Sequence, residues 1–208
     1  MKLTINADEL RSWGVCKNGL EEFVKAHGEK TVSLEKALES NTVKDFFYVF
    51  DRNKNRFPDA QVKDIKLLIC DFAEHVLAFF EEEYPKDKRP RKAIETARKY
   101  INGDASTDDV VVAAADATDA AHSVTSAFYI AAAVADVVIA ALDDDAFAAH
   151  FVVSAASIYA YVAGRKDEQQ WQRQKLIELI EKWKKDFTIK VVNDENINKK
   201  SLDLKNTI

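Results

Sequence analysis

Residues 59–84 have the sequence DAQVKDIKLLICDFAEHVLAFFEEEY, and this stretch decides the fold. Its apolar side chains recur every three or four residues, so on a helix they would share one face. The stretch therefore predicts a long helix with one buried face, and Pro85 is expected to end it. The apolar positions are Val62, Ile65, Ile69, Phe72, Val76, Phe79 and Phe80.

Further helices are predicted on the C-terminal side of this stretch. Pro90 stands where a first-turn proline begins a helix, and a last helix is predicted over residues 169–187. About one residue in three between 107 and 164 is alanine, and small side chains let helix backbones pack closely. With only 5 glycines and 3 prolines in 208 residues, the chain is expected to be all-α. Residues 57–187 are predicted to form an alanine-rich helical bundle.

The two ends of the chain are expected to differ from the bundle. Residues 1–56 are predicted to form a small helical N-terminal module, with Asn6 and Glu9 as a capping box at its first helix. The aromatic run at 46–50 could be a strand, but Thr42 as a cap and the helical neighbours favour a helix. Residues 188–208 are predicted to be a short strand or a loose tail.

Several features indicate a cytoplasmic protein that does not cross a membrane. The first residues contain no export signal, and Cys16 and Cys70 share no metal-like spacing, which fits two buried, unpaired thiols in a reducing cytosol. The best membrane candidate, residues 128–142, is too short and carries Asp136, so a buried helix is expected there.

The net charge of -5 is concentrated in one segment. Between Tyr100 and Gly164 there is no lysine or arginine, against nine aspartates. Such a segment would repel nucleic acid and attract a basic protein. A basic protein partner is therefore expected, without direct nucleic-acid binding. The alanine-rich faces are also compatible with a homo-oligomer.

Acidic and basic residues crowd together between Glu81 and Glu95, around two predicted helix ends. One hypothesis is a clamp between helices, in which arginines fix the turn through two-pronged hydrogen bonds to carboxylates. Arg91 and Glu95, one turn apart, are also expected to pair. The other hypothesis is a partner-binding site made by this charged turn and the aspartates that follow it. The residues predicted to bind the partner are Glu82, Asp87, Arg89, Arg91, Glu95, Asp116, Asp119, Asp136, Asp143, Asp144 and Asp145.

The sequence offers little for catalysis or metal binding. It has no nucleophile elbow, no phosphate-binding glycine loop and no zinc-protease motif, so no catalytic residue or cofactor is predicted. His122 follows Asp119 by three residues and His150 follows Asp143 by seven, which makes these two histidines the candidate metal ligands. A dinuclear bundle would need a second such pair and two glutamates. A histidine at the surface or satisfied by hydrogen bonds is the favoured interpretation at each position.

Some of these residues carry a family resemblance. Cys70-Asp-Phe-Ala-Glu-His75, Arg89-Pro-Arg-Lys-Ala-Ile-Glu95 and Glu168-x-x-Trp171-Gln172 resemble a helical immunity protein family of bacterial polymorphic toxin systems, over about residues 65–175. The resemblance implies an all-helical, non-enzymatic antitoxin that binds and neutralises a toxin. Separately, Gly14-Val-Cys-x-x-Gly-Leu-x-x-Phe23 resembles a short N-terminal module found in bacterial and phage proteins.

Three functions therefore compete. The first is an immunity-type or phage counter-defence inhibitor that binds a toxin, a nuclease or a defence protein. The second is an acidic mimic of DNA that blocks restriction or CRISPR machinery, although nine acids over this length are sparse for a duplex mimic. The third is an enzyme or metal protein whose site is assembled in the bundle from Arg91, Asp119, His122 and His150.

Overall fold

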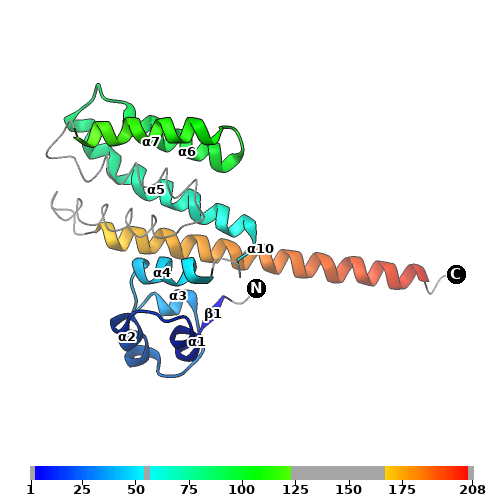
Figure 1. Ribbon diagram of the computed structural model, residues 1–208. Coiled ribbons are helices and arrows are strands. Elements are labelled where there is room, and N and C mark those ends of the chain that lie inside the picture. Colours follow the sequence, from blue (N-terminus) through cyan, green and yellow to red (C-terminus); the bar gives the residue numbers. More distant parts are fainter. Residues whose placement is uncertain (1–2, 54–56, 123–166, 206–208) are drawn as a thin grey trace.

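The computed structural model describes residues 3–53, 57–122 and 167–205, and these are all-α apart from one small sheet (Figure 1). The sheet pairs β1 with β2 antiparallel, with Thr4 opposite Ser33 and Ile5 opposite Val32. The predicted fold class is confirmed. The elements are β1 (Thr4–Ile5), α1 (Ala7–Ser12), α2 (Lys17–His27), β2 (Val32–Ser33), α3 (Leu34–Ala37), α4 (Val43–Asn53), α5 (Asp59–Glu83), α6 (Arg89–Asn102), α7 (Thr107–His122) and α10 (Glu168–Lys205).

Helix α5 is the centre of the described bundle, with α6 against one side of it and α10 against another (Figure 1). Its predicted apolar face is buried at Ile65, Ile69, Phe72, Val76 and Phe80, and half-buried at Val62 and Phe79. The helix ends at Glu83, as the following Tyr84-Pro85 predicts. The stretch quoted above therefore forms the predicted element almost to the residue.

Helices α6 and α7 form an antiparallel pair that lies on the outside of α5 (Figure 1). Pro90 lies in the first turn of α6, as predicted, and Gly103 ends that helix with a left-handed φ of 87°. Three alanines of α7 are fully or almost fully buried at this interface, which confirms close packing of small side chains in this helix. They are Ala113, Ala117 and Ala120.

Helix α10 crosses the molecule between α5 and α4 and then extends beyond them (Figure 1). Leu176, Ile180 and Trp183 bury its inner face, and the Trp183 ring N–H donates to Asp64 of α5 at 2.8 Å. The prediction of a short strand or loose tail over residues 188–208 is wrong for residues 188–205, which continue the helix to Lys205. Adding residues to a helix that is already nucleated is far easier than starting one, so β-branched residues can follow the packed part.

The N-terminal helices enclose a small apolar cluster of Ile5, Ala7, Leu10 and Phe23. Helix α4 carries Phe47 into the main core instead, where it contacts Phe72 of α5 edge to face. Asn6 caps α1 as predicted, by accepting the Glu9 N–H at 3.0 Å. Residues 46–50 are helical, also as predicted, and the Thr42 hydroxyl accepts the Asp45 N–H.

The two cysteines have different environments. Cys70 is completely buried in the main core, as predicted, and burial raises the pKa of its thiol to about 12. The prediction that Cys16 is buried is wrong, because its side chain is exposed at the start of α2. There its sulfur accepts the Gly19 N–H at 3.4 Å and takes the place of a capping oxygen. Within the described parts of the chain, every helix is too polar or too short to span a bilayer.

Candidate functional site

The charged turn between α5 and α6 is held by one arginine of α6. Arg91 donates to both oxygens of Glu81, at 2.6 Å from Nε and 2.7 Å from Nη2, and its Nη1 donates to Glu74 at 3.0 Å. This bidentate hydrogen bond lowers the pKa of the Glu81 carboxyl. The prediction that Arg91 pairs with Glu95 is wrong, because Arg91 contacts α5 rather than its own helix.

A second arginine of α6, two helical turns further along, also binds two carboxylates of α5. Arg98 donates to Asp71 at 2.6 Å and to Glu74 at 2.8 Å. Glu74 therefore accepts hydrogen bonds from Arg91 and Arg98, one through each carboxylate oxygen. We call this set of residues, Asp71, Glu74, Glu81, Arg91 and Arg98, the α5–α6 clamp. Its carboxylates are matched by cations inside the molecule.

The turn itself is closed by a second local pair. The Asp87 carboxylate accepts hydrogen bonds from the Arg89 side chain at 2.6 and 2.9 Å and from the Arg89 backbone N–H at 3.1 Å. These bonds lower the pKa of Asp87. The pKa of Arg89 is raised, first by Asp87 and then by the charges of Asp119 and Asp116 on α7. Four of the residues predicted to bind the partner therefore influence one another electrostatically, although about 30 positions of the sequence separate the two pairs. They are Asp87, Arg89, Asp116 and Asp119.

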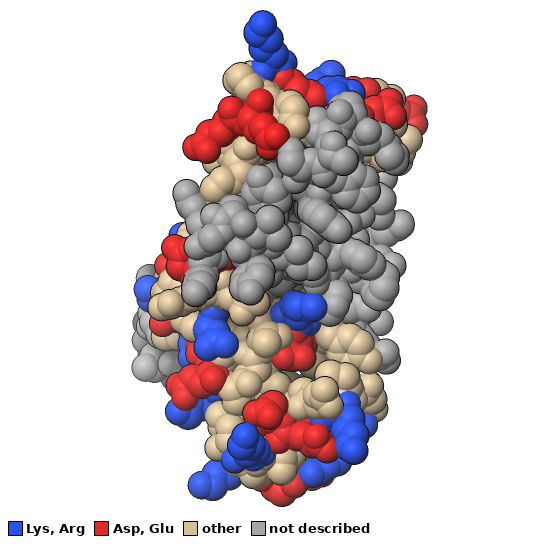
Figure 2. All heavy atoms as spheres, turned by 90° about the vertical axis from the view of Figure 1, so that its left-hand side faces the viewer, with Lys and Arg blue, Asp and Glu red and all other residues tan. Residues whose placement is uncertain are grey.

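The carboxylates of α7 differ from those of the clamp. Asp109 belongs to the helix start, where it accepts the Ser106 N–H at 2.9 Å and the Ser106 hydroxyl at 2.7 Å. Asp108 and Asp119 are exposed, and Asp116 is half-buried. Among the described residues, these three aspartates have no hydrogen bond or ion pair that would neutralise them. On the face seen in Figure 2, acidic and basic side chains lie next to each other at the end of the molecule formed by α6 and α7.

The remaining predicted residues fall into two groups. Glu82 and Glu95 are exposed on α5 and α6. Asp136, Asp143, Asp144, Asp145 and His150 lie outside the described residues, and of His122 only the helical backbone is described. Over residues 3–53, 57–122 and 167–205, the structure brings together no group of three or more histidine, cysteine, aspartate or glutamate side chains that could hold a metal ion.

A buried polar group on the other side of α5 was not singled out by the sequence patterns. Glu168, only 2% exposed, accepts hydrogen bonds from His75 at 2.7 Å and from Gln172 at 2.9 Å. The ring of Trp171 stacks on the ring of His75 with centroids 3.7 Å apart. All four residues belong to the segments that carry the family resemblance, and that was the available signal. The hydrogen bonds satisfy a carboxylate that would be costly to bury alone.

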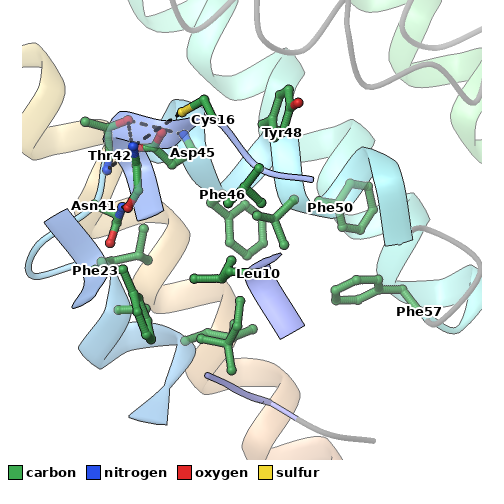
Figure 3. Close-up of a pocket in the computed structure, with 17 residues that line it drawn as sticks. Leu10, Cys16, Phe23, Asn41, Thr42, Asp45, Phe46, Tyr48, Phe50 and Phe57 are labelled. Carbon is green, nitrogen blue, oxygen red and sulfur yellow. Dashed lines mark hydrogen bonds between the residues drawn. The ribbon is translucent and has the colours of Figure 1, made fainter. Parts of the chain in front are cut away.

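The N-terminal module contains a separate small pocket, shown in Figure 3. It measures about 70 Å³ and is lined mainly by apolar side chains, with Cys16, Thr42 and Asp45 together at one side. Gly19 allows the close approach there, since a Cβ at this position would lie 3.1 Å from an Asp45 oxygen. An apolar cavity about twice this size is known to hold one benzene ring, so this pocket has room for little more than one side chain.

Comparison with known proteins identifies the bundle. The family model described as "Imm-5 like putative immunity protein" matches residues 59–179, which is more than half of the chain. No curated protein and no solved structure matches the chain significantly. The matched range begins with α5 and contains the α5–α6 clamp, all of α7 and the His75–Glu168 pair. The predicted resemblance is confirmed, and the chain belongs to the Imm-5 like immunity protein family.

Proposed function

We propose that this chain is a non-enzymatic inhibitor that neutralises a basic toxin, nuclease or defence protein by binding it at the α6–α7 end of the molecule. Membership in an immunity protein family supports a protein partner such as a toxin. It also supports a role that consists of binding rather than catalysis.

One observation carries the choice of surface. Asp71, Glu74 and Glu81 of α5 are matched by Arg91 and Arg98. In contrast, Asp108, Asp116 and Asp119 of α7 form no hydrogen bond or ion pair among the described residues. Unmatched carboxylates raise the rate at which a basic partner finds a surface, and they favour that partner over acidic competitors. The guanidinium of Arg89, which is bound to Asp87, also places a positive charge near Asp116 and Asp119 at this end of the molecule.

The α5–α6 clamp has a structural part in this proposal. Its five charged side chains bind one another and hold α6 on α5. Because α7 packs mainly on α6, the clamp positions the acidic surface without contributing free charge to it. The clamp hypothesis for the charged turn then applies to Arg91 and Glu81, and the partner-binding hypothesis applies to the aspartates of α7.

The test is a titration of inhibition. The tagged full chain captures its partner from host lysate at about 50 mM salt, where screening is weak, and the purified partner is then assayed for toxicity or nuclease activity. A binding inhibitor abolishes this activity at a fixed molar ratio that does not change with incubation time. If the chain abolishes the partner's activity at a small fraction of that molar ratio, it acts as a catalyst, and the proposal is contradicted. A lysate that yields no stoichiometric partner would contradict it too.

A further inference from the structure

Two neighbouring valines of α7 lie on the surface. Val111 is 52% exposed and Val112 is 59% exposed. Among the residues whose side chains the structure describes, the only other large apolar side chain with high exposure is Phe187. Valine is a weak helix former because its branched side chain loses rotamer freedom. A pair of valines on the outside of a helix therefore contributes little to folding, and another role accounts for them better.

The spacing along α7 puts these valines between two carboxylates. Positions 108, 112, 115 and 119 follow one another at intervals of four, three and four residues, so their side chains lie along one line of the helix. Val110, Ala113, Ala117 and Ala120 occupy the opposite, buried face. We call the exposed line the α7 outer face, which consists of Asp108, Val111, Val112, Ala115 and Asp119.

The α7 outer face has the layout of a small binding site, with an apolar centre and a charged rim. Its two charged members, Asp108 and Asp119, are both acidic, and α7 has no lysine or arginine. An apolar side chain on a partner could bury itself against the two valines while cations beside it meet Asp108 and Asp119. An acidic partner would be repelled at both ends.

We propose that the α7 outer face is the central contact of this protein with its partner, and that it receives an apolar side chain flanked by lysine or arginine. The inference rests on the function proposed above and adds to it the chemistry of the partner segment. It assigns most of the affinity to the valines, and the rate and specificity of association to the aspartates.

The test measures binding of a defined probe to the full chain. The probe is a fluorescent helical peptide of leucine and lysine, with a lysine and serine peptide of equal charge as its control. The Leu/Lys peptide is expected to bind, and Val111→Ser/Val112→Ser should weaken it about tenfold or more. The matched variant Glu22→Ser/Lys25→Ser alters two exposed residues of α2, keeps the net charge, and should bind as the unaltered chain does.

Three results would overturn the inference. The first is equal binding of both peptides, and the second is unchanged affinity of the Leu/Lys peptide for the valine variant. The third is a fall of more than about 2 °C in the Tm of that variant, since exposed side chains that serve only binding do not stabilise the fold. If a partner is captured and binds the Val111→Ser/Val112→Ser variant with unchanged affinity, this inference fails while the proposed function stands. If no stoichiometric partner is captured, the proposed function fails and this inference fails with it.

Discussion

Arg91 of α6 binds the Glu81 carboxylate of α5 through two parallel hydrogen bonds, Nε to Oε1 at 2.6 Å and Nη2 to Oε2 at 2.7 Å. Glu81 lies in the last turn of α5, where the helix dipole disfavours a negative charge. The guanidinium supplies the opposite charge at that point and ties the end of α5 to the first turn of α6. The pair therefore controls how α6, and α7 upon it, are placed on the bundle.

Replacing Arg91 should destabilise the protein. Arg91→Ala removes three charge-assisted hydrogen bonds. Because Arg91, Glu74 and Glu81 are all partly exposed, the expected loss is about 1–2 kcal/mol of unfolding free energy. Urea unfolding of Arg91→Ala, Glu81→Ala and the double variant would give a coupling energy near 1 kcal/mol. Lys92→Ala, an exposed neighbour, is the control and should have almost no effect. Strictly additive losses for Arg91 and Glu81 would contradict the described contact.

The contribution of Glu81 should depend on pH with a defined sign. The folded-state pKa of Glu81 lies below its ordinary value of 4.5, chiefly because Arg91 donates to the carboxylate. Its stabilising effect is thus complete above the unfolded pKa and is lost as the pH falls through the folded pKa. The difference in unfolding free energy between the unaltered chain and Glu81→Gln should be constant above about pH 6 and shrink towards about pH 3. An equal difference in unfolding free energy at about pH 6 and about pH 3 would contradict the effect of Arg91 on Glu81.

The buried Glu168 should matter more than its exposed neighbours. Glu168→Ala leaves the side chains of His75 and Gln172 without their acceptor, which is expected to cost about 2 kcal/mol. Gln169→Ala, at the next and exposed position, should change stability by less than about 0.5 kcal/mol. Thermal unfolding followed by circular dichroism measures both. Equal Tm values for the two variants would mean that Glu168 has no structural role in joining α10 to α5.

Gly103 should resist substitution for reasons of backbone geometry alone. Its φ of 87° is a conformation that other residues adopt with strain, while a Cβ there would meet no atom within 4 Å. Gly103→Ala is therefore expected to cost about 1 kcal/mol without any steric clash. Gly103→Asn should cost less, because asparagine tolerates the left-handed region better. The order of the two unfolding free energies is the check, and a more stable alanine variant would contradict it.

Local patterns predicted the helices well where the apolar period was strong. The bounds of α5, the roles of Pro85 and Pro90 and the helix over 46–50 all follow from periodicity, proline geometry and capping. The same reasoning failed at residues 188–205, because β-branched residues indicate a strand when a segment is considered alone. The packed part of α10 precedes them and continues the helix.

The candidate site was predictable in composition but not in pairing. The crowding of charges between Glu81 and Glu95 indicated a clamp. The spacing of neighbours on one helix predicted Glu95 as the partner of Arg91. In the structure, Arg91 instead binds two carboxylates of α5. His75 and Glu168 are 93 residues apart, and no local pattern links them. Which aspartates of α7 remain unmatched also depends on how α6 and α7 pack.

The most direct test of the central claim is the Kd of the captured partner for three forms of the full chain. Asp116→Asn/Asp119→Asn neutralises two acids of α7, and Glu21→Gln/Glu22→Gln removes the same charge from exposed positions of α2. The claim predicts that only the α7 variant raises the Kd, by about tenfold at low salt, and that this difference shrinks as salt is added. If both variants raise the Kd equally, or neither does, the acidic surface of α7 is not where the partner binds.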